Sequence, residues 1–179
     1  MYRTPEEYDR MDQLAISLYV DYDLNEFPID EKVLCRKMGI NLVPYSAHGI
    51  ENRKILSKRS KEGFLNYGVT DIRPTIFYND CDNSVYGNCR QTIFHELKHF
   101  LEEDKDEEED DLAEHFGRYL ACPTAYLIWK KITNVNEIIS TFDVSASIAK
   151  NVSSSVENRI NRYGYRIFDY EKPLINLFK

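Results

Sequence analysis

The chain has 179 residues, of which 42% are hydrophobic and 30% are charged, so it is long and apolar enough to form one folded domain rather than a disordered chain. Its net charge of -7 arises mainly from residues 102–111, which hold nine acidic side chains and one lysine, and the remainder is close to neutral. This balance makes binding to nucleic acid over a broad surface unfavourable, because phosphate binding needs clustered positive charge.

The sequence indicates a cytoplasmic protein. It has no apolar run of the ~20 residues that a membrane-spanning helix needs, and its start, MYRTPEEYDR, lacks the layout of a signal peptide. Its cysteines form no C-x-x-C pair, so we predict reduced and mostly buried thiols at Cys35, Cys81, Cys89 and Cys122. Cys81 and Cys89 also leave open a disulfide or a second metal site, although their spacing demands neither.

The first part of the chain is typical of two helices. Residues 5–22 place apolar side chains among acidic ones, and residues 29–38 have their apolar side chains on one face. Pro28 separates the two segments. Asp30 stands at the N-cap position of the second helix, and Gly39 follows it at the C′ position.

The pattern then changes to short aromatic and β-branched segments with turn residues between them. Residues 40–46, 62–68 and 73–80 are of this kind and predict a small, mostly antiparallel sheet. The basic stretch at 53–61 is interpreted as a solvated loop or an edge strand, with a partner-binding patch as the alternative.

Helices are predicted again in the second half. Asn88 and Gln91 have the spacing of a capping pair for one helix, and a second helix over residues 109–121 ends before Pro123. Farther along, Asn134 precedes another predicted helix. The next helix is indicated by apolar residues at every fourth position, namely Ile148, Val152, Val156 and Ile160. We expect the aromatic tail, residues 163–179, to pack back on the body.

The helix after residue 88 contains the motif H-E-x-x-H, formed by His95, Glu96 and His99. Residues four apart lie on one face of a helix, so the two imidazoles can bind one Zn²⁺ at ~2.0–2.1 Å. Glu96 would then lie beside the metal and act as general base on the water bound to it. The alternative is an ordinary helix with two polar histidines, but the apolar stripe on its other side argues against a simple surface helix.

A catalytic zinc needs a third protein ligand and one open position. Ala113, Phe116, Gly117 and Leu120 predict the inward face of the second helix, and Asp110 lies three residues before Ala113. Asp110 is therefore the expected third ligand, with Glu109 as the alternative, and the small side chains would let the two helices approach.

Four further residues are weaker candidates. Glu114 is predicted either to accept a hydrogen bond from a ligand histidine or to be an exposed helix acid. His115 is a candidate for stabilising an oxyanion, with no role as the favoured alternative. Tyr78 and Tyr86, just before the motif helix, are other candidates for that oxyanion role.

The stretches QTIFHELKHFLEE and EDDLAEHFGRYLACP resemble the ImmA/IrrE family of zinc metallopeptidases, many of them encoded by phages and mobile elements. Matching positions include Thr92, His95, Glu96 and His99 on the first helix and Ala113, Phe116, Leu120 and Pro123 on the second. Three positions depart from the family pattern. Lys98 replaces a glycine, Asp110 stands where the family has its ligand glutamate, and Gly117 replaces an alanine.

The resemblance implies an α+β, gluzincin-like fold with a zinc-metallopeptidase domain over residues 1–130 and a helical C-terminal extension over residues 131–179. It also implies an edge strand, expected at residues 75–79, that holds extended substrate. The implied function is a hydrolase that cleaves a helix-turn-helix repressor of a phage, mobile element or stress response.

Two other functions remain open. One is a non-catalytic regulator that binds and sequesters a repressor, although a pure binder has no need of Glu96. The other is DNA binding through the C-terminal helices, which the acidic balance disfavours. Neither alternative involves a membrane.

Overall fold

A computed structural model of the chain describes residues 3–68, 73–81, 86–103 and 110–179, and the side chains of residues 86, 87 and 110 fall outside the description. The helices are α1 (Pro5–Asp21), α2 (Glu31–Lys37), α3 (Ile50–Arg59), α4 (Tyr86–Glu102), α5 (Asp110–Ala121), α6 (Thr124–Lys130), α7 (Val135–Phe142), α8 (Ala146–Tyr163) and α9 (Lys172–Leu177). The strands are β1 (Asn41–Pro44), β2 (Gly63–Asn66) and β3 (Thr75–Tyr78), and short 3-10 turns are η1 (Tyr45–Ala47) and η3 (Asp169–Glu171). The α+β class is confirmed.

The strands form one mixed sheet in the order β1-β3-β2. β1 pairs with β3 in parallel and β2 pairs with β3 antiparallel, so the prediction of a mostly antiparallel sheet is only half right. β3 is central, and the expectation that residues 75–79 form an edge strand is therefore wrong. The two outer strands of the described sheet are β1 and β2.

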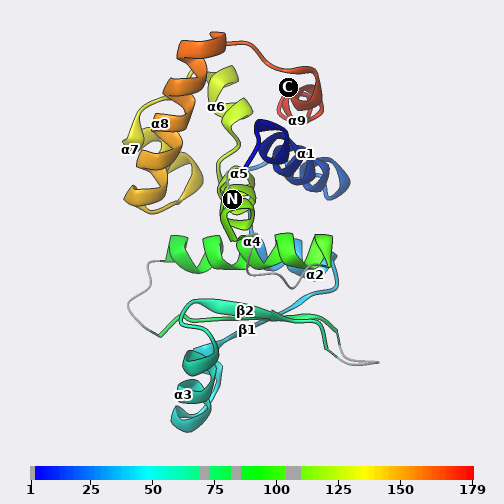
Figure 1. Cartoon of the computed structure of the whole chain (residues 1–179), viewed down its shortest axis with the longest axis vertical. Coiled ribbons are helices and arrows are strands. Elements are labelled where there is room, and N and C mark those ends of the chain that lie inside the picture. Colours follow the sequence, from blue (N-terminus) through cyan, green and yellow to red (C-terminus); the bar gives the residue numbers. More distant parts are fainter. Residues whose placement is uncertain (1–2, 69–72, 82–85, 104–109) are drawn as a thin grey trace.

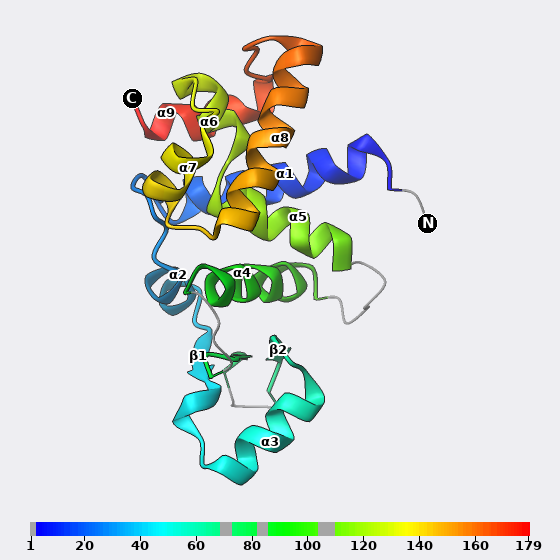
Figure 2. The same cartoon turned by 90° about the vertical axis from the view of Figure 1, so that its left-hand side faces the viewer.

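Helix α4 lies in the middle of the molecule, with the sheet on one side and α5 and α1 on the other (Figures 1 and 2). Its apolar stripe is buried, since Ile93 and Leu97 are at most 1% exposed, and Ile76 of the central strand is fully buried. The motif helix is thus packed on both sides, and burying one apolar side chain of this size contributes about 1.5–3 kcal/mol.

Two predictions of local structure are wrong. Residues 53–61 were expected as a loop or edge strand, but α3 covers most of them and projects beyond the sheet (Figure 1). Its long straight-chain residues have good helix propensity, and Arg53 Nε donates to the carbonyl of His48 at 2.6 Å at its first turn. Asn88 was expected as an N-cap, but α4 starts two residues earlier, at Tyr86.

The other predicted helices are confirmed, together with two caps. The side chain of Asp30 accepts hydrogen bonds from the amides of Lys32 and Val33, and Asn134 caps α7 in the same way. Gly39 follows α2 with a φ of 75°, a left-handed conformation in which glycine is favoured. These caps depend on residues next to one another in the chain, which explains why sequence patterns find them.

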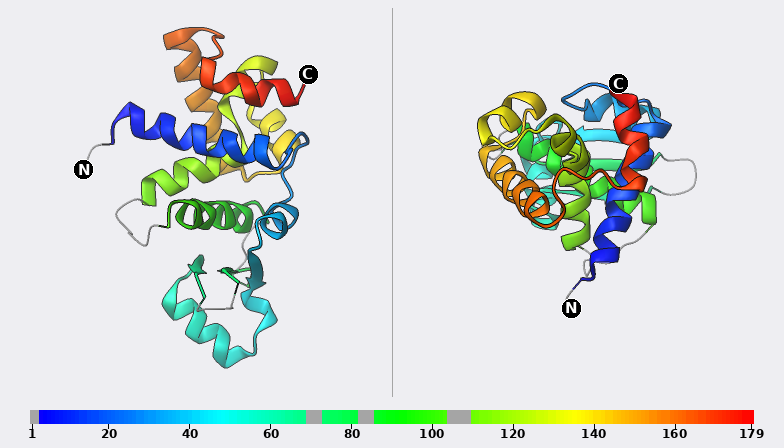
Figure 3. Two further views of the ribbon diagram at one scale, coloured as in Figure 1. Left: turned by 90° about the vertical axis from the view of Figure 1, so that its right-hand side faces the viewer. Right: turned by 90° about the horizontal axis from the view of Figure 1, so that it is seen from above.

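The C-terminal segment packs back on the body, as expected. Helix α9 lies against α1 and α6 (Figure 3), and its side chains Leu174 and Ile175 are buried in the common core. Arg159 of α8 forms a bidentate ion pair of 2.5 and 2.6 Å with the fully buried Glu171 of η3.

Among the described residues, no helix is long and apolar enough to cross a membrane.

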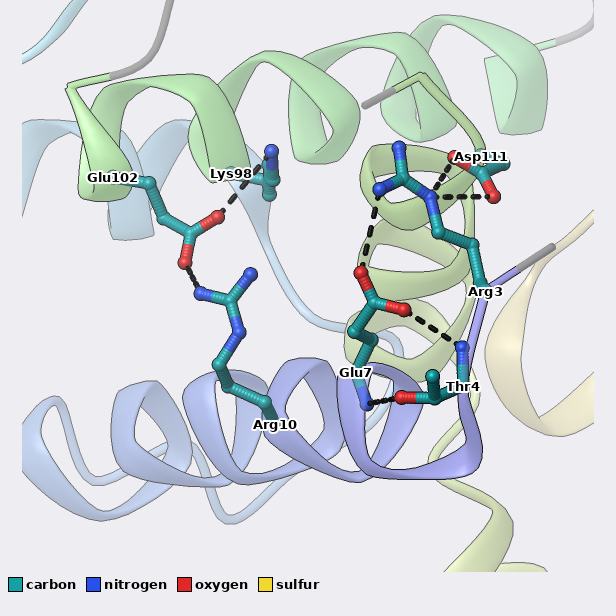
Figure 4. Close-up of polar contacts among 7 residues, drawn as sticks. All are labelled: Arg3, Thr4, Glu7, Arg10, Lys98, Glu102 and Asp111. Carbon is teal, nitrogen blue, oxygen red and sulfur yellow. Dashed lines mark hydrogen bonds and ion pairs between the residues drawn. The ribbon is translucent and has the colours of Figure 1, made fainter. Parts of the chain in front are cut away.

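Helix α1 and the residues just before it contact both motif helices through ion pairs (Figure 4). Arg3 contacts Asp111 of α5 at 3.1 Å, and Arg10 pairs with Glu102 at the end of α4. Glu102 also lies 3.3 Å from Lys98, whose side chain is fully buried. Lys98 therefore points toward α1, and the same carboxylate balances one exposed and one buried cation.

We expect Glu102→Ala to lower the free energy of unfolding by about 1–3 kcal/mol, because it leaves the ammonium of Lys98 buried without this carboxylate. Lys98→Met, which removes the buried charge and keeps the volume, is expected to cost less than Glu102→Ala. Urea denaturation followed by circular dichroism measures both.

The matched control is Glu51→Ala, which breaks the exposed pair between Glu51 and Lys54. An exposed pair of this kind contributes at most about 0.5 kcal/mol. An equal loss of stability in Glu51→Ala and Glu102→Ala would show that burial of Lys98 does not set the cost.

Candidate metal centre

The two histidines of the motif converge on one face of α4. Their Nε2 atoms are 3.3 Å apart and their ring centroids are 5.1 Å apart. Both side chains are half-buried and line a cleft of about 1940 Å³. One wall of this cleft comes from β2 and the end of α3, and the other comes from α5 and the start of α8.

The spacing of the two nitrogens suits a shared metal ion. Two nitrogens that each lie ~2.05 Å from a tetrahedral Zn²⁺ are separated by about 3.3 Å, because the angle between tetrahedral ligands is ~109°. The observed distance of 3.3 Å matches this value. It also suits a hydrogen bond between neutral imidazoles, in which one ring nitrogen carries the proton. The histidine pair therefore fits the metal without requiring it.

Glu96 lies between the histidines in sequence and reaches the outer edge of the sheet. Its Oε2 accepts a hydrogen bond from the amide of Leu65 in β2 at 2.8 Å. This bond fixes the carboxylate at the rim of the cleft, on the same helix as the imidazoles. A carboxylate held there is in a suitable place to exchange a proton with a molecule bound in the cleft.

Two further contacts fix β2 and its following turn against α4. The hydroxyl of Tyr67 donates to the carbonyl of His99 at 2.6 Å. Gly63 lies so near Thr92 that a Cβ at this glycine would be 2.7 Å from the threonine methyl group. A glycine inside a strand is a sequence signal for such a close approach of two backbones or side chains, and Gly63 carries that signal.

Helix α5 also approaches the motif helix closely, as its small residues predicted. Ala113 is fully buried, and a Cβ on Gly117 would lie 2.8 Å from Gln91 Nε2 and 3.2 Å from the amide nitrogen of His95. Gln91 Nε2 in turn donates to the carbonyl of Glu114 at 3.2 Å. Gly117 therefore allows α5 to lie close to α4 beside His95.

The series Gly117→Ala, Gly117→Val and Gly117→Leu tests this packing. The larger side chains are expected to push α5 away from α4 and to lower the free energy of unfolding by about 1–3 kcal/mol. Alanine should cost least, because Gln91 is flexible and alanine favours a helix by ~1 kcal/mol over glycine. Thermal unfolding measures the series, and equal stability for alanine and leucine would contradict the close approach.

The side chains of the two residues predicted as third ligand lie outside what the structure describes. Asp110 begins α5, but its side chain and the whole of Glu109 belong to the part that is not described. Among the described residues there is no group of three or more His, Cys, Asp or Glu side chains that could hold a metal ion. The roles of Asp110 and Glu109 therefore stay predictions.

The structure places Glu114 and His115 in different surroundings. Glu114 is among the residues that line the cleft, and its side chain is mostly exposed and lies 3.8 Å from Arg118. His115 faces α1 instead, where its Nε2 is 2.7 Å from Asp12 Oδ1. This contact accounts for His115 without the oxyanion role. Burial of Asp12 at this contact raises the pKa of its carboxyl.

The two tyrosines give no support for an oxyanion role. Tyr78 belongs to the central strand and is not among the described residues that line the cleft. Burial, together with the nearby Asp80, raises the pKa of its hydroxyl. Tyr86 begins α4, and its side chain is not described.

All four cysteines have free thiols, as expected. Cys81 is exposed, whereas Cys35, Cys89 and Cys122 are buried. Burial raises the pKa of Cys35 and of Cys122 to about 12, so both thiols stay protonated at neutral pH. A disulfide between Cys81 and Cys89 is not formed.

Some residues of the cleft were not predicted as site residues, although Arg59 and Lys61 belong to the basic stretch for which a partner-binding patch was the alternative. They lie at the end of α3 and at the start of α8, namely Arg59, Lys61, Ser145, Ser147, Ile148 and Asn151. Their positions in the cleft depend on how distant segments pack, and no local pattern records this. The start of α8, in the segment considered for DNA binding, faces the same cleft as the histidines.

Comparisons of the chain with protein-family models, with curated proteins and with solved structures found no match. The function must therefore be inferred from the cleft itself. Its central features are the paired imidazoles of His95 and His99 and the carboxylate of Glu96 at the edge of the sheet.

Proposed function

We propose that this protein is a zinc-dependent endopeptidase of the gluzincin-like type, as the resemblance to the ImmA/IrrE family implies. The observation that carries the proposal is the pair of Nε2 atoms 3.3 Å apart in a large cleft, with Glu96 held beside them by Leu65. His95, His99 and Asp110 would hold the zinc, with Glu109 as the alternative third ligand. The zinc, when bound, supplies a Lewis acid that polarises the scissile carbonyl and makes water more acidic.

The residues of the chain perform the remaining steps. Glu96 takes a proton from the attacking water and later delivers it to the leaving amine. The amide of Leu65 orients this carboxylate while it is ionised, because an N–H donor stabilises the charged form. Loss of that charge on protonation weakens the bond and frees the carboxyl group to transfer its proton.

The substrate is an extended segment of a protein that lies along the outer edge of β2. Strand β2 is the outer strand on the side of Glu96, which corrects the expected edge at residues 75–79. Sheet edges pair readily with an added strand, and here the substrate would pair with the outward carbonyls of β2, since the amides of Gly63 and Leu65 already donate to Ser60 and Glu96. Such pairing brings a peptide bond past the imidazoles without a requirement for a particular side chain.

The proposed substrate is a helix-turn-helix repressor of a phage, a mobile element or a stress response, and the proposed site of action is the cytoplasm. Both proposals rest on the resemblance in the two motif helices. DNA is a poorer partner, since the chain carries a net charge of -7 and the start of α8 lines the cleft.

The test uses full-length protein loaded with zinc, the same protein stripped by a chelator, and the repressor encoded nearest to its gene. Zinc-loaded protein is expected to cut the repressor at one or a few bonds, and zinc added back to the stripped protein should restore the cut. Mass spectrometry of the fragments measures the result.

A second candidate is a regulator that binds the repressor without cutting it. The cleft is large enough to hold an extended segment in either case. A stable complex with no fragments in the presence of zinc would favour this candidate, and the fixed position of Glu96 would then be a structural feature of the edge strand.

A further inference from the structure

The end of α3 forms part of the cleft wall. Arg59, Ser60 and Lys61 line the cleft beside β2, whereas Lys58 does not. None of the residues of α3 is buried, so a hydrophobic core does not account for this helix. Its position beyond the sheet places its last turn next to the strand that the substrate is proposed to follow (Figure 1).

Arg59 is held in a defined place at this wall. Its guanidinium carbon lies 4.0 Å from the centre of the Phe64 ring, and that ring stacks on Phe77 with centroids 5.0 Å apart. Arg59 is exposed, and it makes no hydrogen bond or ion pair with the residues that the structure describes. A stacked guanidinium keeps its N–H donors free at its rim, where they can bind a carboxylate in a bidentate manner.

Arg59 and Glu96 contact neighbouring residues of β2. Phe64 and Leu65 are neighbours in the strand, so their side chains point to opposite faces of the sheet. The amide of Leu65 points to the outer edge, where it meets Glu96, and the Phe64 side chain lies under Arg59. An extended chain along this edge would place every second side chain on the face where Arg59 lies.

We propose that Arg59 binds a carboxylate of the substrate and makes the cleft select segments with an acidic side chain close to the cleaved bond. This inference rests on the proposed function, since it assigns the substrate chemistry of the same cleft. The other cations at the cleft differ from Arg59. Arg118 already lies 3.8 Å from Glu114, and Lys61 is followed directly in the chain by the acidic Glu62.

A carboxylate at Arg59 has two sources: an Asp or Glu side chain, or the free C-terminus of a peptide. The side chain is the better fit, because an endopeptidase cleft continues on both sides of the cleaved bond. Peptides with amidated C-termini separate the two sources, since amidation removes the terminal charge and keeps the side chains.

The experiment measures binding to the full chain carrying Glu96→Gln, which prevents loss of the peptides by hydrolysis. The probe is an array of ten-residue peptides of varied sequence, each made in a Glu and a Gln version and with a free or an amidated C-terminus. We expect the amidated Glu version of the bound peptides to bind about tenfold more tightly than the Gln version. Adding Arg59→Glu should abolish this preference.

The matched control is Lys58→Glu, which makes the same change of charge one residue away and outside the cleft. It should keep the tenfold preference for Glu, and Arg59→Gln should lose it without introducing a negative charge. Melting temperatures close to that of the parent chain would show that the variants are folded.

The inference would be overturned by equal binding of Glu and Gln peptides, by equal loss of the preference in the Lys58 and Arg59 variants, or by a preference only for free C-termini. Failure to bind any peptide of the array at millimolar concentration would do so as well. The proposed function is judged separately, by whether the zinc-loaded chain with Glu96 intact cuts the peptides. A preference for Glu without cutting would support Arg59 and contradict the peptidase.

Discussion

Replacing Glu96 by glutamine is expected to lower kcat for peptide hydrolysis by about 10²–10⁴-fold, the range that general base catalysis contributes. The amide has nearly the shape of the carboxylate and can still accept a hydrogen bond from Leu65 through its oxygen. It cannot take a proton from water. The bound zinc and the KM are therefore expected to change little, and steady-state kinetics on a peptide that the parent chain cuts measure the effect.

The control for Glu96→Gln is Glu62→Gln, the same chemical change in another cleft-lining carboxylate. Its kcat should stay within about threefold of the parent value, because its carboxylate is exposed and has no place in the proposed proton transfer. A Glu96→Gln chain that turns over at the parent rate would exclude Glu96 as the base, whatever the zinc content.

Replacing His95 by alanine is expected to reduce bound zinc from about one equivalent to nearly none. The two imidazoles share one ion in the proposed site, so loss of one leaves too few ligands. The affinity for zinc should fall by more than the ~10–100-fold that residues contacting the ligands contribute. Elemental analysis after dialysis and competition with a coloured chelator measure the loss, and His99→Ala should behave alike.

His48→Ala provides the matched histidine control. His48 packs near Phe77 with ring centroids 6.1 Å apart and is not among the described residues lining the cleft, so its loss should leave the zinc content unchanged. Asp110→Ala and Glu109→Ala then identify the third ligand, because only one of them should lose zinc. Full zinc in the His95→Ala chain would contradict the metal site as a whole.

The helical part of the candidate site could be predicted because it depends on helical periodicity. A separation of four residues places His95 and His99 on one face in any α-helix, and their nitrogens do lie 3.3 Å apart. The small residues Ala113 and Gly117 similarly predicted that α5 packs closely on α4. Neither prediction needed knowledge of the sheet.

The order of the strands could not be predicted in the same way. Each strand has only four residues, and alternation over so short a length shows which side chains share a face but not which strand is central. Because β3 lies between β1 and β2, residues 75–79 do not form the edge strand, and the proposed substrate edge is β2. Non-local pairing of this kind depends on the packing of whole elements rather than on neighbouring residues.

The sequence by itself therefore determined the arrangement of the motif: the histidine pair and its glutamate lie on one helix, and the pairing follows from a periodicity that acts over one turn. The surroundings of the motif were decided only when the chain folded. Packing between separate elements decided three features. It buried Lys98 beside Glu102, brought the amide of Leu65 to Glu96, and placed Arg59 in the wall of the cleft. Such contacts are set by side-chain packing between those elements, which no local pattern records.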